Sequence, residues 1–260
     1  MATFIDAHTH IDQHDADEWP DIVARAEEAG VGAIIAAGVT IESSERCVQL
    51  AEQFPGVVWA GVGVHPMDIS GPLSDSEIAR LRELASHERV VCISEVGLDW
   101  EPGRPDRVAQ EQAFRAQLRL AVELNLPVIF HNREAGMEPL RIIAEEVGNK
   151  VPVVAHYFQG PLGYAHACLN QGIYLSLAKP LLRLPDLQEI IEKHAPLESI
   201  VLETDSYPQP YKKNRNNWTE PRDVPMVAAK VAELKGISVD EVAETTTATI
   251  QRVLGRDILT

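Results

Sequence analysis

The chain has 260 residues, of which 45% are hydrophobic and 24% are charged, and its formal net charge is −16. This composition is typical of a globular protein, and the length suits a single α/β domain over residues 1–260. The acidic balance argues against a broad nucleic-acid-binding surface, because phosphate contacts require lysine and arginine on the contacting face. A local basic site is still compatible with it.

The sequence has no apolar run that would cross a membrane and no signal-like N-terminus. We therefore expect a cytoplasmic protein without a membrane partner, and the sequence does not indicate its oligomeric state. Three widely spaced cysteines, Cys47, Cys92 and Cys168, include no C-x-x-C pair. They predict buried free thiols rather than disulfides or a cysteine-ligated zinc site.

Apolar runs typical of strands alternate with periodic segments typical of helices. This alternation predicts β-α units and a parallel sheet. The predicted strands are residues 3–7, 33–37, 57–64, 90–94, 127–130, 151–155, 173–177 and 199–202. Eight such units in about 250 residues predict a closed TIM (β/α)8 barrel.

Helical periodicity covers residues 17–29, 41–54, 75–87, 107–124, 135–147, 162–170 and 186–194. After a polar loop at 206–221 come two more helices, at 223–235 and 239–254, the last of which is an extra C-terminal helix. Asp75 and Asp106 are plausible N-caps, and Ser238 with Glu241 has the spacing of a capping box.

The first predicted strand leads into His8 and His10, an H-x-H pair. Side chains alternate faces along a strand, so both imidazoles can bind one metal ion. A single pair of this kind arises easily by chance. Its interpretation depends on the residues that follow the other strands.

Residues of metal-ligand type do follow the other strands, at the end where an α/β barrel carries its active site. They are His65, Glu95, His131, His156 and Asp205. With His8 and His10, and without His65, they supply four imidazoles and two carboxylates, enough for two divalent ions with a bridging carboxylate. The alternative, separate polar residues at solvated strand ends, explains each one but not the set. His65 is instead a candidate for binding substrate.

The remaining histidines do not follow strands. His14, His87, His166 and His194 fall in predicted loops or helices. We expect them at the protein surface.

Seven ordered motifs resemble those of the TatD-family metal-dependent hydrolases, which belong to the wider amidohydrolase-like barrels, and they cover essentially the whole chain. The motifs are Asp6-Ala7-His8-Thr9-His10, Gly63-Val64-His65-Pro66, Glu95-Val96-Gly97-Leu98-Asp99, His131-Asn132-Arg133, His156-Tyr157-Phe158-Gln159-Gly160, Glu203-Thr204-Asp205-Ser206 and Asn216-Asn217-Trp218-Thr219-Glu220-Pro221.

The resemblance implies nuclease-like cleavage of DNA at a two-metal centre. It implies that one ion is bound by His8, His10 and Asp205, that the other is bound by His131 and His156, and that Glu95 bridges them. Mixed imidazole and carboxylate ligation suits zinc, manganese, iron, cobalt, nickel or magnesium.

Three positions depart from the family pattern. Ser94 stands where glycine usually precedes the glutamate, Gln159 where serine or threonine is common, and Tyr207 where proline often follows. None of these changes removes a ligand, so they bear on the choice of substrate.

Two divalent ions would activate water and polarise a phosphoryl or carbonyl oxygen. Asp205, beside metal and water, is placed to take a proton and return it to the leaving group. We assign Glu95 to catalysis as well, as the bridge. Arg133 and Lys179 are candidates for pairing with phosphate oxygens, although both also fit as surface charges.

The loop at 206–221 carries a basic cluster, Lys212, Lys213 and Arg215, beside Tyr211 and Trp218. Cations interleaved with aromatic rings suit the end of a single-stranded nucleic acid. A solvated loop without such a partner is the alternative.

Three functions remain in competition. The first is a nuclease or phosphodiesterase that acts on nucleic-acid ends or on a small phosphoester. The second is a carbonyl hydrolase of an amide, lactone or aminoacyl ester, because the same metal pair serves either electrophile. The third is a metal-binding protein without catalysis.

Overall fold

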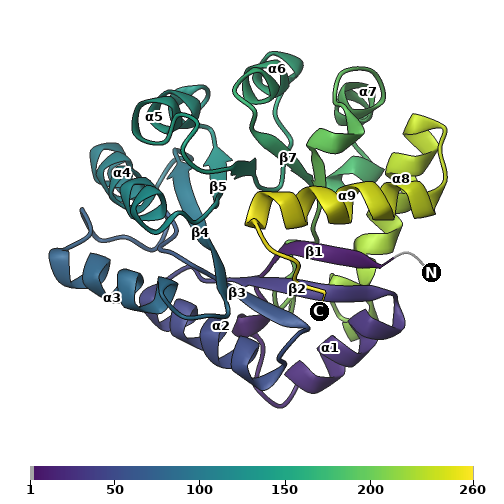
Figure 1. The fold of residues 1–260 in the computed structure, drawn as a ribbon, viewed down its shortest axis with the longest axis horizontal. Coiled ribbons are helices and arrows are strands. Elements are labelled where there is room, and N and C mark those ends of the chain that lie inside the picture. Colours follow the sequence, from purple (N-terminus) through teal and green to yellow (C-terminus); the bar gives the residue numbers. More distant parts are fainter. Residues whose placement is uncertain (1–2, 260) are drawn as a thin grey trace.

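The computed structural model describes residues 3–259, which form one eight-stranded parallel sheet surrounded by nine α-helices (Figure 1). The strands pair in chain order: β1 (Phe4–Thr9), β2 (Val31–Ala37), β3 (Val58–Val62), β4 (Val90–Asp99), β5 (Val128–Arg133), β6 (Val153–Ala155), β7 (Tyr174–Leu177) and β8 (Ile200–Leu202). Past β8, the Asp205 amide donates to the His8 carbonyl at 3.0 Å, which joins this segment to β1. The predicted TIM barrel is confirmed.

The helices occupy the predicted segments, and their ends either coincide with the prediction or differ from it by at most three residues. They are α1 (Trp19–Glu28), α2 (Ile41–Gln53), α3 (Asp75–Ala85), α4 (Arg107–Leu124), α5 (Glu138–Glu146), α6 (Leu162–Asn170), α7 (Pro185–Lys193), α8 (Val224–Lys235) and α9 (Val239–Leu254). None of these helices is long and apolar enough to cross a membrane.

Side-chain caps define several helix starts. Asp106 and Ser238 accept the backbone N–H three residues on, as predicted. The prediction for Asp75 is wrong, because Ser74 is the cap and exchanges reciprocal hydrogen bonds with Glu77. Asp75 is instead the first helical residue, where a carboxylate still interacts favourably with the helix dipole.

Three strands extend past their predicted ends: β1 by two residues, β5 by three and β4 by five. The pairing of β4 with β5 continues from Val96 opposite Phe130 to Asp99 opposite Arg133. Gly97 permits this extension, since its φ is +147° and an added Cβ would lie 2.1 Å from the His131 carbonyl oxygen. Glu95 and His131 are therefore held by the sheet rather than by loops.

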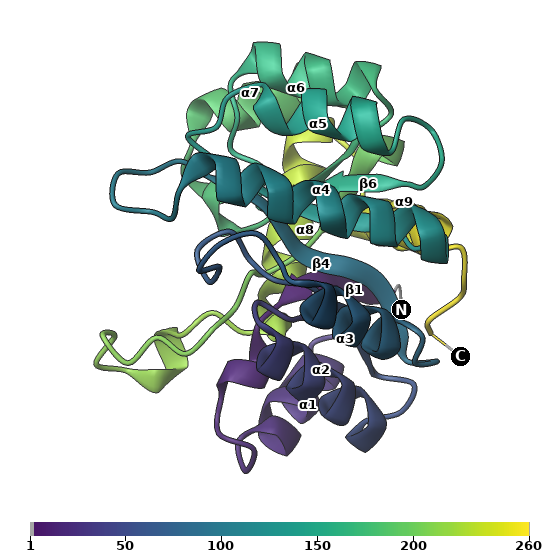
Figure 2. The same ribbon diagram turned by 90° about the vertical axis from the view of Figure 1, so that its left-hand side faces the viewer.

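The barrel interior is filled by inward-facing strand side chains such as Ile5, Ile35 and Ile129, and α9 covers it with Ile250 and Val253. Figure 1 shows α9 lying across this end of the barrel, and Figure 2 shows the same arrangement from the side. The C-terminal ends of the strands lie at the opposite end of the barrel. That end is left open for a functional site.

The prediction for the cysteines is confirmed, and the prediction for His14 is wrong. Within the described chain, all three cysteines are free and buried, as predicted. His14 is not a surface residue but is only 1% exposed. The centroid of its ring lies 5.9 Å from that of Trp218, and its carbonyl accepts a hydrogen bond from Arg46 at 3.0 Å. The loop at 206–221 and helix α2 therefore cover it.

Candidate metal centre

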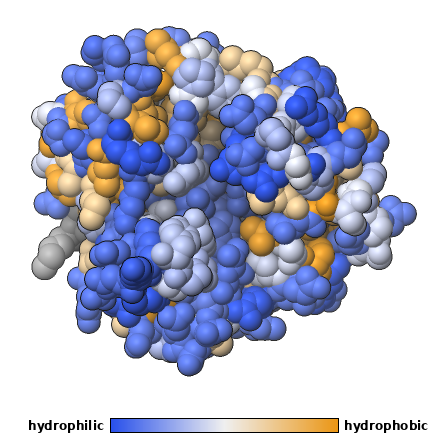
Figure 3. Space-filling model, turned by 180° about the vertical axis from the view of Figure 1, so that it is seen from behind, coloured by the Kyte–Doolittle hydropathy of each residue, from blue (hydrophilic) through white to orange (hydrophobic). Residues whose placement is uncertain are grey.

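A cavity of about 950 Å³ opens at the end of the barrel opposite α9. Figure 3 shows this face of the molecule with a hollow in mostly hydrophilic surroundings. The residues lining the cavity include most of the predicted site: His10, His65, Glu95, His131, Arg133, His156 and Asp205. His8 is fully buried directly behind them.

The first cluster forms where β1 meets the segment after β8. The Nε2 atoms of His8 and His10 are 3.3 Å apart, so the two rings converge as the strand alternation predicted. Glu95 Oε2 lies 3.5 Å and 3.3 Å from these two nitrogens. Asp205 Oδ1 lies 3.3 Å from His10 Nε2 and 4.0 Å from His8 Nε2.

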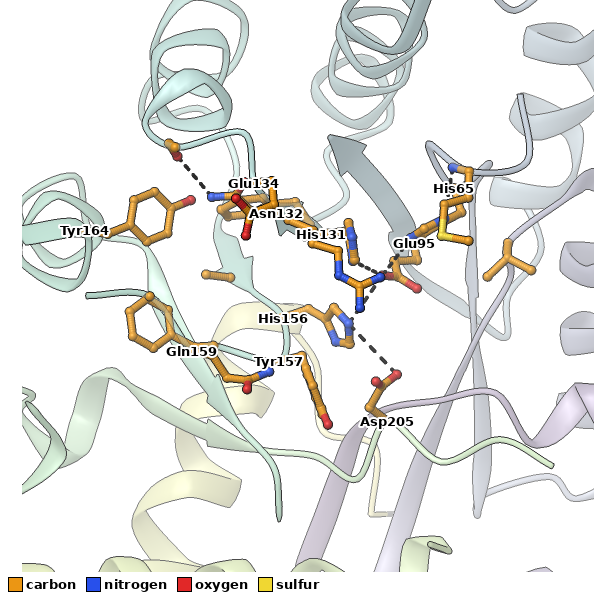
Figure 4. A pocket seen from close by; sticks show the side chains of 18 of the residues that line it. His65, Glu95, His131, Asn132, Glu134, His156, Tyr157, Gln159, Tyr164 and Asp205 are labelled. Atoms are coloured by element: carbon orange, nitrogen blue, oxygen red, sulfur yellow. Dashed lines mark hydrogen bonds and ion pairs between the residues drawn. The ribbon is translucent and has the colours of Figure 1, made fainter. Parts of the chain in front are cut away.

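The second cluster surrounds the other oxygen of the same glutamate. Glu95 Oε1 lies 2.9 Å from His131 Nδ1 and 3.3 Å from Nε2 of both His156 and His65. Figure 4 shows His131 and His156 from neighbouring strands converging on this point. The two oxygens of one buried carboxylate thus face two separate sets of imidazoles, which is the geometry of a bridging ligand.

The backbone places Asp205 in this centre. Its φ is +50°, in the left-handed region that aspartate tolerates better than most residues. The buried carboxylate of Asp6 holds the preceding turn, because it accepts the Thr204 amide at 2.9 Å. Asp6 therefore ties the H-x-H strand to the Asp205 segment.

Four of the histidines have their second ring nitrogen close to a group that can accept a hydrogen bond. His10 Nδ1 lies 2.9 Å from the Ala37 carbonyl, and His8 Nδ1 lies 3.2 Å from Ser94 Oγ. His156 Nδ1 lies 3.0 Å from Glu203 Oε1, and His131 Nε2 lies 3.5 Å from Asp99 Oδ2. A hydrogen bond at this nitrogen, as in His10 and His8, fixes the tautomer and leaves the lone pair of the other nitrogen for a metal ion. The His156 and His131 contacts are close ion-pair distances without hydrogen-bond geometry.

His65 has the opposite arrangement. Its Nδ1 accepts a hydrogen bond from the Met67 amide at 3.1 Å. A neutral His65 therefore carries its proton on Nε2, the nitrogen that faces Glu95. This tautomer makes His65 a hydrogen-bond donor to the centre, whereas the other four rings are suited to be ligands.

The pKa values of the centre reflect a dense cluster of opposite charges. Burial lowers the pKa of His8. For His156, burial also opposes charge, but the carboxylates of Glu203 and Glu95 outweigh it and raise the pKa to about 10. Burial favours a neutral Glu95, yet His65 and His156 hold its pKa well below the usual range. The ionised carboxylates are thus balanced by positive charge, a role that metal ions suit.

The two predicted phosphate-binding residues lie in different environments. Arg133 lines the cavity, and its guanidinium is 3.2 Å from Glu101 Oε2 with about half of the side chain exposed. Lys179 is not among the described residues that line the cavity, and its ammonium pairs with Asp223 at 2.7 Å. The structure brings Arg133, but not Lys179, to the centre.

The three residues that depart from the family pattern lie in two different places. Gln159 and Tyr207 line the cavity. Ser94 is fully buried and contacts His8 from behind. Ser94 therefore bears on the orientation of His8 rather than directly on substrate.

Sequence reasoning missed the residues behind the ligands. These are Asp6, the Ala37 carbonyl, Asp99 and Glu203. Glu203 and Asp99 stood in motifs but had no assigned role, and nothing in the sequence joins Glu203 to His156. The only available signal was the type of residue, since ligand histidines usually contact a carboxylate or carbonyl.

Comparison with known proteins gives the same family as the motifs. The family model of TatD related DNases matches residues 5–255. The uncharacterized metal-dependent hydrolase YabD of Bacillus subtilis is 32% identical, over 95% of this chain and 96% of its own. The 3'-5' ssDNA/RNA exonuclease TatD of Escherichia coli K12 is 33% identical, over 92% and 94%. The structure of YJJV, a TatD homologue from the same species, superposes with a TM-score of 0.86 at 27% identity, covering 98% of both chains. The chain belongs to the family of TatD related DNases.

Proposed function

We propose that the protein hydrolyses phosphodiester bonds at the ends of single-stranded nucleic acid, with two divalent metal ions. The observation that carries this proposal is the position of Glu95, whose two oxygens face separate sets of imidazoles. A site for one ion would need only one of these sets. The exonuclease activity in the name of the Escherichia coli relative supports the choice of substrate.

Groups of three donor atoms that lie within 4.8 Å of one another occur on both sides of Glu95, which supports two ions. His8, His10 and Asp205 would hold one ion, His131 and His156 the other, and Glu95 both. Divalent ions bound there would lower the pKa of water and polarise the phosphoryl oxygen. Zinc, manganese, iron, cobalt, nickel and magnesium are all compatible with this mixed ligation.

The side chains around the ions divide the remaining work. Asp205 accepts the proton of the attacking water and returns it to the leaving oxygen, because its Oδ1 faces the centre from the open side of the cavity. His65 donates from Nε2 to a phosphoryl oxygen. Arg133, at the cavity wall, pairs with another phosphate oxygen.

The test combines elemental analysis with a substrate comparison on one sample. Protein purified without added metal is loaded with each candidate ion and assayed on a chromogenic phosphodiester and on a carboxylic ester. We expect about two ions per chain and turnover of the phosphodiester. Turnover of the ester alone would support the carbonyl-hydrolase function, and two bound ions without turnover of either would support a non-catalytic metal-binding protein.

The bridge is tested by Glu95→Gln, with Glu88→Gln as the matched control because Glu88 has 81% of its side chain exposed. Loss of the full negative charge of the bridging carboxylate should lower both metal content and turnover in Glu95→Gln only. Equal metal content and rate in the two variants would rule out the bridging role.

A further inference from the structure

The cavity extends beyond the metal ligands into a side lobe, which lies between the segments that follow β5 and β6. The side lobe is lined by Asn132, Gly136, Met137, Phe158, Gln159, Pro161 and Tyr164. Figure 4 shows Tyr164 and Gln159 on one side of His131 and His156, with His65 and Glu95 on the other. The whole cavity of about 950 Å³ is at the upper end of the range for sites that bind organic ligands, so it offers more space than a phosphodiester fills.

The walls of the side lobe are aromatic and apolar. The rings of Phe158 and Tyr164 stack with centroids 6.0 Å apart and an interplanar angle of 11°. The chain passes close to them at Gly160, where an added Cβ would lie 2.6 Å from Tyr164 Cδ1. Met137 covers another side with 52% of its surface exposed. Flat apolar walls of this kind favour a flat, uncharged ligand group.

A few polar atoms are placed among these walls. The Asn132 Oδ1 and Tyr164 hydroxyl atoms are buried and have no hydrogen-bond partner among the described residues. Tyr164 is 94% buried, and Figure 4 shows its hydroxyl directed toward Asn132. The exposed amide of Gln159 offers both a donor and an acceptor to the cavity.

The charges around the side lobe disfavour an anionic occupant. No residue of the side lobe is a cation, and the carboxylate of Glu134 lines the adjoining wall. A second phosphate group would therefore be repelled, whereas a neutral heterocycle would not. The cation that lines the cavity, Arg133, lies beside the metal centre instead, since its guanidinium is 3.8 Å from the Asp99 carboxylate that contacts His131.

We propose that the side lobe binds the nucleobase of the nucleotide whose phosphodiester is cleaved, with Met137 packing on the base and Gln159 bonding its polar edge. This inference rests on the proposed function. Aromatic and apolar walls with a few amides are the chemistry by which proteins hold single-stranded bases. The lobe is continuous with the metal centre, so one nucleotide can occupy both.

The experiment uses substrates that share one leaving group. Thymidine 5′- and 3′-(p-nitrophenyl phosphate) are compared with methyl p-nitrophenyl phosphate on the metal-loaded enzyme, because only the nucleoside esters can fill the side lobe. We expect kcat/KM at least about tenfold higher for one of the nucleoside esters, within the range that stacking of one base contributes. Thymidine monophosphate should also inhibit at least about tenfold more strongly than methyl phosphate.

The side lobe is probed by the double variant Met137→Ala/Gln159→Ala, which alters two exposed residues and leaves the buried rings intact. It should lower kcat/KM for the preferred nucleoside ester at least about fivefold more than for the methyl ester, and weaken binding of thymidine monophosphate. The control is Met226→Ala/Gln53→Ala, on α8 and at the end of α2, with a methionine of similar exposure at 50%.

Three outcomes overturn the inference. If wild-type enzyme hydrolyses methyl and nucleoside esters equally well, the phosphodiesterase function stands but the base-binding lobe does not. If the double variant keeps the nucleoside preference, the lobe is not where the base binds. If no phosphodiester is hydrolysed with both ions bound, the proposed function and this inference fail together.

Discussion

The metal centre and the basic loop at Tyr211–Trp218 lie on the same end of the barrel, yet their charged groups are used differently. The candidate ligands converge on a cavity, and the second nitrogen of each candidate ligand histidine contacts a partner behind it. In the basic loop, by contrast, Arg215 pairs with Glu220 at 2.6 Å and with Glu18 at 3.2 Å. Its guanidinium also stacks on Trp218 at 4.2 Å.

The difference shows which charges are available to a substrate. Lys212 donates to the Asn217 carbonyl at 3.1 Å, so two of the three cations in the basic loop already have partners within the protein. Figure 2 shows the loop that follows β8 projecting from the barrel. The interactions of Arg215 hold this projecting loop to the protein, whereas the contacts of the candidate ligand histidines leave their other ring nitrogen facing Glu95. A cluster of basic residues in the sequence is therefore weaker evidence for a nucleic-acid-binding site than residues of metal-ligand type at strand ends are for a metal site.

The largest effect expected in the metal centre is that of Asp205→Asn. Asparagine keeps the shape and a carbonyl oxygen that can coordinate weakly, but it cannot accept and return a proton near neutral pH. We expect the variant to retain much of its metal and to lose at least about a hundredfold in kcat, the low end of general acid–base catalysis. Metal content and single-turnover rate are measured on the same sample. A metal-loaded variant with the wild-type rate would show that another group carries the proton.

A smaller effect is expected at Glu203, which lies behind His156 rather than in the cavity. Its carboxylate is fully buried and contacts His156 Nδ1, the Tyr157 amide at 2.7 Å and the Ser176 hydroxyl. Glu203→Gln should leave the fold intact and weaken metal binding by roughly tenfold to a hundredfold, as loss of a carboxylate behind a ligand histidine does. The measurement is a competitive titration with a chelator.

The matched control for Glu203→Gln is Glu189→Gln, whose carboxylate has 61% of its surface exposed on α7. Activity at saturating metal separates this positioning role from direct catalysis. If Glu203→Gln binds metal as wild type but has lost turnover even at saturation, Glu203 acts on substrate and the assignment is wrong.

These two residues mark the boundary of what the sequence could predict. Asp205 follows a strand, and barrel geometry brings all such positions together, so the sequence could predict that these side chains lie close together without knowledge of any contact. Glu203 acquires its role from His156 on the segment after β6 and from Ser176 on β7. Contacts between distant segments depend on strand register and packing, which local patterns do not encode.

The wrong predictions have the same physical origin. Ser74 and Asp75 are both good capping residues, and only the extended backbone at Ser74, with ψ of 160°, decides between them. His14 follows no strand and has polar neighbours, so it had the features of a surface residue. It is buried because a segment about 200 residues later folds over it, as the ring contact with Trp218 shows.

His65 offers a smaller and sharper test of the metal centre. If its Nε2 proton is donated to substrate, then His65→Asn should keep full metal content and lower kcat/KM for phosphodiesters by about tenfold, roughly one charge-assisted hydrogen bond. The control is His87→Asn, since the His87 ring contacts Glu52 and the Arg89 amide on the outside of the barrel rather than the metal centre. Loss of one bound ion in His65→Asn would instead make His65 a ligand.

The smallest effects are expected in the basic loop, and they should differ between its cations. Arg215→Gln removes the pairs with Glu220 and Glu18, so it should lower stability by about 1 kcal/mol and the Tm by a few degrees. Its effect on oligonucleotide binding should be slight.

Lys213 is exposed, so Lys213→Gln should leave the Tm unchanged and reduce the salt dependence of binding by less than one counterion. Thermal unfolding and salt titrations of binding to a single-stranded oligonucleotide measure both. If Arg215→Gln flattens the salt dependence without changing the Tm, the guanidinium binds nucleic acid, and the contrast between the two regions fails.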